Sequence, residues 1–448
     1  MKNTLPTAGT NVPRVLVLQF ARLGDLVQTL PVLTALKAYH SNVEIDLLCP
    51  EPLVPLAMMF PCVAQVLPWP AEAWHALARA RDGEISKVLG RAERLLTRYP
   101  DAPYSVAYNL NNHPRAVLAA HLLSERVYGV GSRGPLVDDP DPWMRYLHYI
   151  ARKRGQNPIH LIDAWCGLCG VAPPGHVPRI PEVPVALPRD LRQFTTSDAL
   201  RVALIIGAGD ANRRIPLAVW KVWITTLLAR NEHARVVVLG SRGERALGVS
   251  LLDGLSSDCL GRVWDACGRI GLAELVAVLS RCHWVVGADT GPLHVGAACG
   301  ARAMGWYVSR ARVHETGPYG VGHWIWQAEP IEACERSDRC DSVETRPDTW
   351  PIAESVDLVL GQTCSVPPSG WSLWESRHDE WGAWYENSVT GETFRDRRRD
   401  IWAHLNGVSE VDWRSMHQLI GDRDPAAARN MHRDEHSHSR ISYSQVGV

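Results

Sequence analysis

The chain repeats one local pattern, in which a short apolar run is followed by a turn and then by apolar residues at helical spacing. The run "RVLVLQF" (14–20) leads through "ARLGD" into "LVQTLPVLTALKAY", and "VEIDLLC" (43–49) is the next apolar run. Short runs of this kind are typical of strands that are covered on both faces. Because a helix separates the two runs, the pattern predicts an α/β fold built on parallel sheets.

The pattern occurs in two blocks. They are separated by residues 170–188, "GVAPPGHVPRIPEVPVALP", whose proline content and lack of periodicity predict a linker. The second block contains the strand candidates "RVALIIGAG", "ARVVVLGS" and "HWVVGAD". We expect an N-terminal domain over 12–185 and a C-terminal domain over 195–362. Because ligands bind at the carboxyl ends of parallel strands, two such domains facing one another would enclose a cleft.

The end of the chain departs from this pattern. The chain has 18 Trp and 4 Phe, and many of the tryptophans lie late in the sequence. Residues 363–420 combine turn signals with alternating aromatic residues, as in "WSLWESRHDEWGAWYENSVTGETF", which predicts a small Trp-rich β extension. Residues 421–448 are polar, and we expect a disordered tail there.

Charge and hydropathy exclude several kinds of partner. The 448 residues carry a formal net charge of -1, so no overall field favours nucleic acid or an anionic membrane. The N-terminus lacks the basic region and apolar core of a signal peptide. No apolar run reaches the length of about 18 residues that a membrane-spanning helix needs. We expect a cytoplasmic protein with no nucleic-acid partner.

The 11 cysteines do not indicate a small disulfide scaffold, because the chain is long and their number is odd. Several lie in apolar runs, where buried thiols are expected. The spacing of Cys166 and Cys169 leaves metal or redox chemistry open, and "CERSDRC" (334–340) leaves a metal site or a disulfide open. We expect structural thiols and no metal.

The stretch "GADTGPLHVGAACG" (287–300) joins a strand to a helix through polar residues. Asp289 and Thr290 lie at the turn, where the free N–H groups of a helix N-terminus favour phosphate. Gly291 lets a ligand approach the backbone, and His294 follows one turn later on the same side. The alternative is that Asp289 or Thr290 only caps the helix and that His294 is a satisfied buried histidine.

Two other turns have a similar form. Asp25, in "QFARLGD", either caps a helix or faces the cleft as a carboxylate that takes a proton. In "IIGAGDANRRIPLAVW", Gly207 and Gly209 permit close approach of the backbone, and Arg213 and Arg214 can neutralise phosphate. A diphosphate is the ligand that these features favour. Neither turn has the full G-x-G-x-x-G motif, so a nicotinamide-dependent dehydrogenase is a weak alternative.

Four segments resemble glycosyltransferase family 9, the heptosyltransferase family of lipopolysaccharide assembly. They are "VLVLQFARLGDLVQTLPVLTALKAYHSNVEIDLLCPE", "DACGRIGLAELVAVLSRC", "VVGADTGPLHVGAACG" and "ETGPYGVGHWIWQ", and the resemblance covers roughly residues 12–360. It implies the GT-B fold, in which two Rossmann-like domains face a cleft. The donor nucleotide would lie in the C-terminal domain and the acceptor in the N-terminal one. Members invert the anomeric centre and need neither metal nor cofactor.

The resemblance also implies roles for the residues singled out above. Asp25 would be the general base that deprotonates an acceptor sugar hydroxyl, which attacks the anomeric carbon as the nucleoside diphosphate leaves. Asp289, Thr290, Gly291 and His294 would lie on the pyrophosphate and ribose side of the donor.

The family commonly has a lysine in the loop that here reads "ANRRIPLAVW". Arg213 or Arg214 would keep its charge. In the acceptor half, "NLNNHPRAV" offers Asn109, His113 and Arg115, with Asn111 beside them.

The best family match for the donor is ADP-heptose, and the acceptor would be a lipopolysaccharide-core or other cell-envelope glycan, free or lipid-linked. Membrane contact, at the inner face of the inner membrane, would be made through that acceptor. The alternative function is a non-catalytic nucleotide-sugar-binding or partner-docking protein, which the missing lysine and the C-terminal extension favour. Within that extension, "PPSGW" and "WGAWYENSVTGETF" resemble a WW module, with Trp384, Tyr385 and Phe394 in place of its usual aromatic residues.

Overall fold

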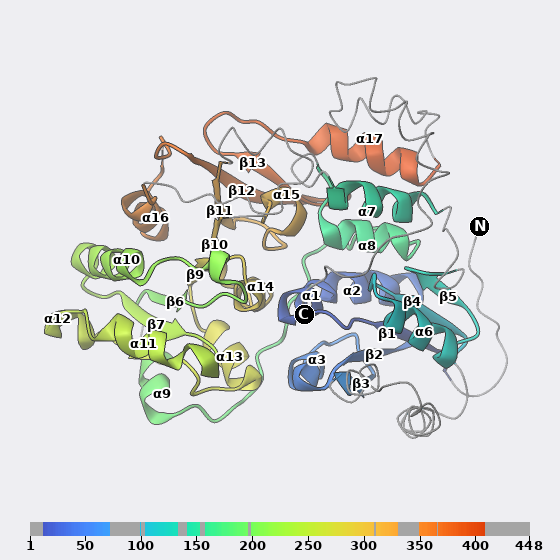
Figure 1. Cartoon of the computed structure of the whole chain (residues 1–448), viewed down its shortest axis with the longest axis horizontal. Helices are drawn as coiled ribbons and strands as arrows, with labels where there is room; N and C mark the ends of the chain where they lie inside the picture. Colours follow the sequence, from blue (N-terminus) through green and yellow to red (C-terminus); the bar gives the residue numbers. More distant parts are fainter. Residues whose placement is uncertain are drawn as a thin grey trace, which may run out of the picture.

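The computed structural model describes residues 12–71, 99, 104–132, 141–152, 157–195, 199–308, 311–329, 349–364 and 366–407. The segment 334–340 and the tail 421–448, on which two of the expectations above fall, lie outside these residues. Figure 1 shows two α/β domains side by side, each with helices on both faces of its sheet. In the described ranges, no helix has the length and apolar character needed to cross a membrane.

The N-terminal domain contains a five-stranded parallel sheet in the order β3-β2-β1-β4-β5. Its central strands are buried on both faces, as the apolar runs predicted. The strands are β1 (Arg14–Leu18), β2 (Glu44–Pro50), β3 (Gln65–Trp69), β4 (Val106–Asn109) and β5 (Val127–Gly129). The helices used below are α1 (Leu23–Gln28), α2 (Leu30–Tyr39), α6 (Pro114–Leu123), α7 (Pro142–Arg152) and α8 (Leu161–Leu168).

The C-terminal domain contains an eight-stranded sheet in the order β13-β12-β11-β10-β9-β6-β7-β8. Six of the strands are parallel, and the last two along the chain are antiparallel additions at one edge. The strands are β6 (Arg201–Ile205), β7 (Arg235–Leu239), β8 (Val263–Asp265), β9 (Trp284–Ala288), β10 (Arg302–Tyr307), β11 (Trp324–Ala328), β12 (Trp371–Asp379) and β13 (Gly382–Asn387). The helices around it include α10 (Leu217–Arg230), α11 (Arg245–Leu252), α13 (Leu272–Leu279), α14 (Gly291–Ala298) and α16 (Ile352–Val359).

The strand order reverses at one place in the parallel part of each sheet. In the first sheet β1 lies between β2 and β4, and in the second β6 lies between β7 and β9. A ligand crevice forms outside the carboxyl ends of the strands at such a switch point. Asp25 follows β1, Gly207 follows β6 and Asp289 follows β9, so all three lie at switch points.

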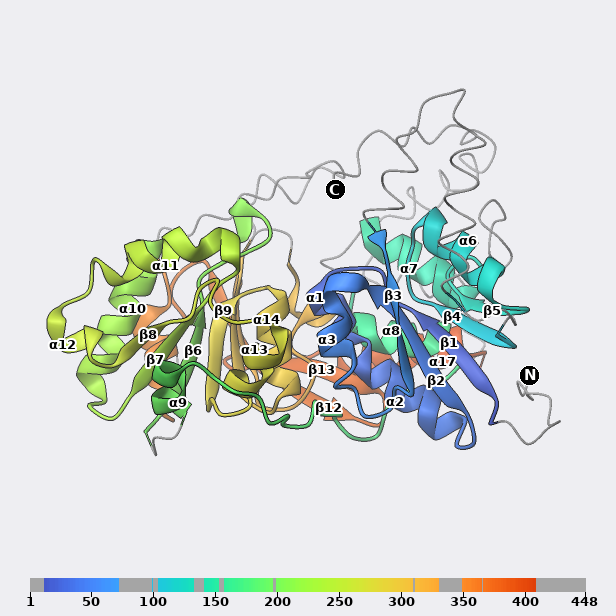
Figure 2. The same cartoon turned by 90° about the horizontal axis from the view of Figure 1, so that it is seen from below.

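The Trp-rich extension belongs to the C-terminal sheet. Strand β12 pairs antiparallel with β11, with Leu373 opposite Trp326, and β13 pairs with β12. The alternating aromatics therefore mark edge strands of a large sheet, and a free-standing WW module is not shown. Figure 2 shows β12 and β13 reaching from the C-terminal sheet toward the N-terminal domain.

The helix that follows, α17 (Arg395–Leu405), lies beside α7 of the N-terminal domain (Figure 1). The ring of Trp402 lies edge-on against that of Trp143, with 4.5 Å between ring centroids. Both side chains are buried. The extension thus joins the two domains by a route separate from the linker.

A buried polar network continues this connection. In α8, Asp163 Oδ1 accepts a hydrogen bond from the Tyr319 hydroxyl at 2.8 Å, and Asp163 Oδ2 accepts one from the backbone N–H of Ala383 at 3.0 Å. Arg398 donates to the carbonyl of Ala383 at 2.8 Å and pairs with Asp379. Burial raises the pKa of Asp163 to about 7, although Arg398 and the two donors lower it.

Candidate active site

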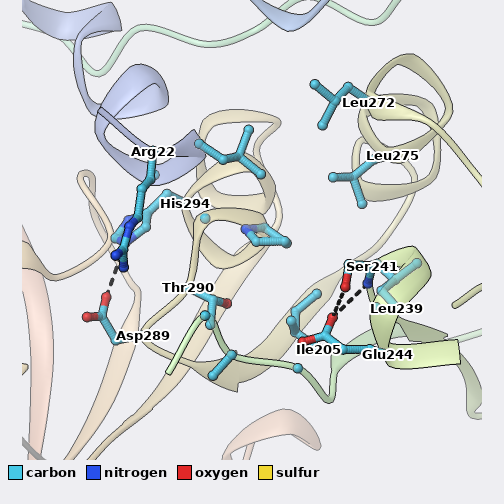
Figure 3. Close-up of a pocket in the computed structure, with 18 of the residues that line it drawn as sticks. Arg22, Ile205, Leu239, Ser241, Glu244, Leu272, Leu275, Asp289, Thr290 and His294 are labelled. Carbon is cyan, nitrogen blue, oxygen red and sulfur yellow. Dashed lines mark hydrogen bonds and ion pairs between the residues drawn. The ribbon is translucent and has the colours of Figure 1, made fainter. Parts of the chain in front are cut away.

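A cavity of about 610 Å³ lies between the two domains at the switch points. The N-terminal domain supplies the first turn of α1 and Gln28, and the C-terminal domain supplies the turns after β6, β7 and β9 (Figure 3). The predicted residues that line it are Asp25, Gly207, Gly209, Arg213, Asp289, Thr290, Gly291 and His294. The structure therefore brings together residues from three separate turns.

Two glycines let the N-terminal ends of α1 and α14 come into direct contact beside the cavity. A Cβ atom on Gly24 would lie 3.3 Å from Cδ2 of His294 and 3.4 Å from Cα of Gly291. A Cβ atom on Gly291 would lie 2.8 Å from Cβ of Leu23, closer than real contacts allow. A larger residue at position 291 would therefore push the two domains apart.

His294 is buried between a partner from each domain. Its Nδ1 lies 3.3 Å from Nε2 of Gln28, and its Nε2 lies 3.4 Å from Oδ1 of Asp289. The same amide nitrogen of Gln28 donates to the carbonyl of Thr316 at 3.5 Å. Because that nitrogen is a donor, Nδ1 of His294 accepts, and the ring proton sits on Nε2 toward Asp289. His294 is thus a satisfied buried histidine and also a cavity residue.

Arg213 faces Asp289. Its Nη1 lies 3.4 Å from Oδ2 and 3.3 Å from the backbone oxygen of Asp289. The hydroxyl of Thr290, the residue before α14, donates to the carbonyl of Ala288 at 3.3 Å and makes no capping bond to the helix. The N-terminus of α14 therefore faces the cavity without a side-chain cap.

Asp25 caps α1 and also lines the cavity, so its position fits both of the readings that the sequence left open. Its Oδ2 accepts a hydrogen bond from the backbone N–H of Arg22 at 3.2 Å, which caps the first turn of α1. The carboxylate is also partly buried in the cavity wall. Burial raises the pKa of Asp25, and the Arg22 N–H, His294 and the Arg22 side chain oppose that shift while Asp289 adds to it. A raised pKa makes the carboxylate a stronger base.

The paired arginines separate in space. Arg213 lines the cavity, whereas Arg214 is exposed and is not among the described lining residues. The sequence could not distinguish them, because which of two neighbouring side chains enters a cleft depends on the backbone of the loop. Here the short helical turn at Ala211–Arg213 places Arg213 toward Asp289.

Glu244 is a cavity residue that the sequence pattern did not single out. Its Oε2 accepts hydrogen bonds from the backbone N–H of Ser241 at 2.7 Å and from the Ser241 hydroxyl at 2.8 Å (Figure 3). Gly207 makes room for it, since a Cβ atom there would lie 1.9 Å from Oε1 of Glu244. The spacing "SRGE" after a strand is a capping-box signal that could have drawn attention to it. Leu239, Ile270, Leu272 and Leu275 form an apolar wall nearby.

The acceptor candidates lie elsewhere. Asn109 is buried, and its amide nitrogen donates to the carbonyls of Val130 at 2.8 Å and Asn111 at 3.3 Å. His113 caps α6, because its Nδ1 accepts from the backbone N–H of Arg115 at 3.1 Å. Asn109, His113 and Arg115 are not among the described residues that line the cavity. Their assignment to the acceptor stays a prediction.

The Cys166 and Cys169 thiols are buried in and next to α8, and both are free. Burial raises the pKa of each thiol. A high thiol pKa disfavours the thiolate that metal binding and redox exchange require. The described residues include no group of three or more His, Cys, Asp or Glu side chains placed to hold a metal ion.

Two mostly parallel sheets whose switch points meet at one cavity define a two-domain α/β protein of the GT-B architecture. A family model for glycosyltransferase family 9 (heptosyltransferase) matches residues 178–343. Over that segment the resemblance to glycosyltransferase family 9 seen in the sequence motifs is confirmed. Among curated proteins, none matches this chain.

Solved structures with the same fold cover most of the chain. A glycosyltransferase family 9 protein from Veillonella parvula superposes with a TM-score of 0.56 at 15% identity, over 80% of this chain and 98% of its own. The heptosyltransferase WaaC of E. coli with ADP-2-deoxy-2-fluoro heptose gives 0.52 at 16% identity, over 78% and 99%. The same enzyme with ADP gives 0.51 at 17% identity, over 68% and 91%. At these identities the likeness establishes the fold.

Proposed function

We propose that this glycosyltransferase transfers heptose from ADP-heptose to a lipopolysaccharide-core or other cell-envelope glycan, with inversion at the anomeric carbon. The observation that carries the proposal is the position of Asp25 on one wall of the cavity, opposite the uncapped N-terminus of α14 on the other. The solved relatives named with ADP and an ADP-heptose analogue support the choice of donor.

Asp25 is the general base in this proposal. It takes the proton of an acceptor hydroxyl, whose oxygen forms a bond to the anomeric carbon from the face opposite the diphosphate. The bond between that carbon and the diphosphate oxygen breaks, and the nucleoside diphosphate leaves. The raised pKa of Asp25 brings the carboxylate closer to the working pH, where a general base is most effective.

The leaving diphosphate lies at α14. The helix N-terminus offers N–H groups and a partial positive charge. Arg213 offers a guanidinium group that can donate two parallel hydrogen bonds to phosphate oxygens. Gly209 and Gly291, which line the cavity, leave the backbone accessible there. His294, held by Gln28 and Asp289, keeps this end of the cavity in one arrangement.

The nucleoside occupies the other end of the cavity. The fixed carboxylate of Glu244 accepts hydrogen bonds from the ribose hydroxyls, and the wall of Leu239, Ile270, Leu272 and Leu275 covers the base. A mostly apolar wall with a few fixed polar groups is the usual form of a small-molecule site.

The acceptor approaches from the N-terminal domain. His113 and Arg115 are the side chains that contact the acceptor in this proposal. Asn109 is left out because its amide nitrogen already donates to backbone carbonyls in the loop after β4 and in Val130. The protein contacts the membrane only through a lipid-linked acceptor in this proposal.

The test is a transfer assay with the purified protein, ADP-heptose and a panel of cell-envelope glycan acceptors, read by mass spectrometry. We expect a product heavier by one heptose residue, with inverted anomeric configuration by NMR. UDP-sugars and GDP-sugars serve as matched donors. Binding of ADP-heptose without transfer or hydrolysis on every acceptor would favour the non-catalytic alternative, and transfer from a UDP- or GDP-sugar alone would overturn the choice of donor.

A further inference from the structure

Arg22 is a second arginine at the cavity, contributed by the N-terminal domain. It precedes α1 and lines the cavity on the side of Asp289 (Figure 3). The guanidinium groups of Arg22 and Arg213 both lie close to Gly209 of the C-terminal domain. A Cβ atom on Gly209 would lie 3.8 Å from Nη1 of Arg22 and 3.8 Å from Nη2 of Arg213. Guanidinium groups from two domains therefore converge on one bare stretch of backbone.

The charges around the cavity leave Arg22 available. Arg213 is already paired with Asp289. Arg22 is exposed, and its guanidinium has no described hydrogen-bond or ion-pair partner within contact distance, although its charge lowers the pKa of Asp25. The acidic lining residues are Asp25, Glu244 and Asp289. The three carboxylates would repel a ligand with two negative charges. Arg213 alone, partly neutralised by Asp289, would not offset that repulsion, so a second cation is needed.

The backbone of Arg22 is tied to Asp25. Its N–H donates to Oδ2 of Asp25 at 3.2 Å. An interaction that holds the Arg22 side chain against the C-terminal domain would therefore also hold the turn that carries Asp25, the proposed base. Helix α1 itself is in contact with α14 through Gly24 and Gly291.

We propose that Arg22 binds the diphosphate of the nucleotide from the N-terminal domain, opposite Arg213, and so couples the occupied donor site to the position of Asp25. This inference rests on the proposed function. In it, the two guanidinium groups hold the diphosphate between the domains over Gly209, and Arg22 stabilises the charge that develops on the leaving group. A planar guanidinium suits this role because it can donate two parallel hydrogen bonds to phosphate oxygens.

The test compares wild type, Arg22→Gln, Arg22→Lys and the control Arg126→Gln, which removes an exposed arginine of the same domain that is not among the described lining residues. Calorimetry measures the affinity of each for ADP, UDP and GDP and for the matching nucleosides adenosine, uridine and guanosine. Loss of one charge-assisted contact should weaken the preferred diphosphate roughly 10- to 100-fold in Arg22→Gln. Arg22→Lys should lie between that variant and wild type, and nucleoside affinity should not change.

The two kinds of failure are distinguishable. If wild type binds one of the diphosphates and Arg22→Gln binds it equally well, the role of Arg22 is overturned while the proposed function stands. If Arg22→Gln loses the nucleoside as well as the diphosphate, the side chain has a structural role and the inference is again overturned. If wild type binds none of the three diphosphates, the proposed function is overturned, and the inference with it.

Discussion

The side-chain amide of Gln28 in the N-terminal domain lies 3.3 Å from Nδ1 of His294 in the C-terminal domain. The contact fixes the tautomer of His294 and directs its other nitrogen toward Asp289. It also joins α1 to α14, the helices that follow β1 and β9, at the wall of the cavity. One hydrogen bond thus relates the element that carries Asp25 to the turn at Asp289, where we propose that the diphosphate binds.

Replacement of Gln28 by Leu should test this relationship. The change keeps a similar volume and removes the donor, so a buried acceptor on His294 loses its partner, which costs about 1–3 kcal/mol. We expect the free energy of unfolding to fall by about that amount, and kcat/KM to fall because His294 is no longer held in one orientation beside Asp289. Leu30→Met, a volume-conserving change in the neighbouring helix, is the control. An unchanged kcat/KM in Gln28→Leu would show that the contact has no functional weight.

Gly291→Ala should separate the domains. The added methyl group would meet Cβ and Cγ of Leu23 at 2.8 Å. Overpacking of this kind typically costs about 1–3 kcal/mol, and it falls at the domain contact. We expect a lower free energy of unfolding in urea and reduced turnover. Gly175→Ala is the matched control, because a methyl group there would have no neighbour within 4 Å; equal stability of the two variants would contradict the close approach.

The stability of the protein should depend on pH through Asp163. Burial raises the pKa of this carboxyl from its ordinary value of 3.8 to about 7 in the folded state. At pH values between these two, folding takes up a proton at Asp163. The protonated carboxyl therefore contributes fully to stability below the unfolded-state pKa, and the contribution is lost as the pH rises through the folded-state pKa. The slope is at most about 1.4 kcal/mol per pH unit.

Urea titrations at several pH values between about 5 and 8 measure this contribution, which is the difference in slope between wild type and Asp163→Asn. We expect wild type to lose stability relative to the variant as the pH rises. Parallel pH profiles for the two proteins would mean that Asp163 is ionised in the folded state across the whole range.

Trp402→Ala should show that the C-terminal extension holds the domains together. The indole is buried against Trp143, and removal of a buried Trp side chain costs about 3–5 kcal/mol. We expect a large fall in the free energy of unfolding and earlier proteolysis of the extension. Val366→Ala, at a side chain that is 74% exposed, is the control. A Trp402→Ala protein as stable as the control would mean that α17 contributes little.

The parts of the fold that follow from local pattern could be predicted from the sequence. The apolar runs at 14–20 and 43–49 became neighbouring parallel strands, and Asp25 and Asp289 followed strands as expected. Each of these inferences needs only the residues within one strand–turn–helix unit. That the two acids line the same cavity needed the further assumption of two facing domains, which the resemblance supplied.

The features that depend on distant segments could not be predicted. The alternating aromatics of β12 indicated a strand but not its partner, and the partner is β11 of the parallel sheet. Asp163 meets the backbone N–H of Ala383, 220 residues later. Glu244 owes its place to the missing side chain of Gly207 on another turn. Asn109 has the polarity of a ligand-binding residue, but its amide is used by neighbouring carbonyls once the loop after β4 is buried.

The most direct test of the account is the Asp25→Asn variant, assayed for transfer from the active donor and for binding of the donor nucleotide. The substitution keeps the shape of the side chain and removes the base, and general-base catalysis contributes about 100- to 10,000-fold. We expect kcat to fall by about that factor while the nucleotide affinity by calorimetry stays within about twofold of wild type. Turnover of Asp25→Asn at the wild-type rate would contradict the central claim that Asp25 is the base.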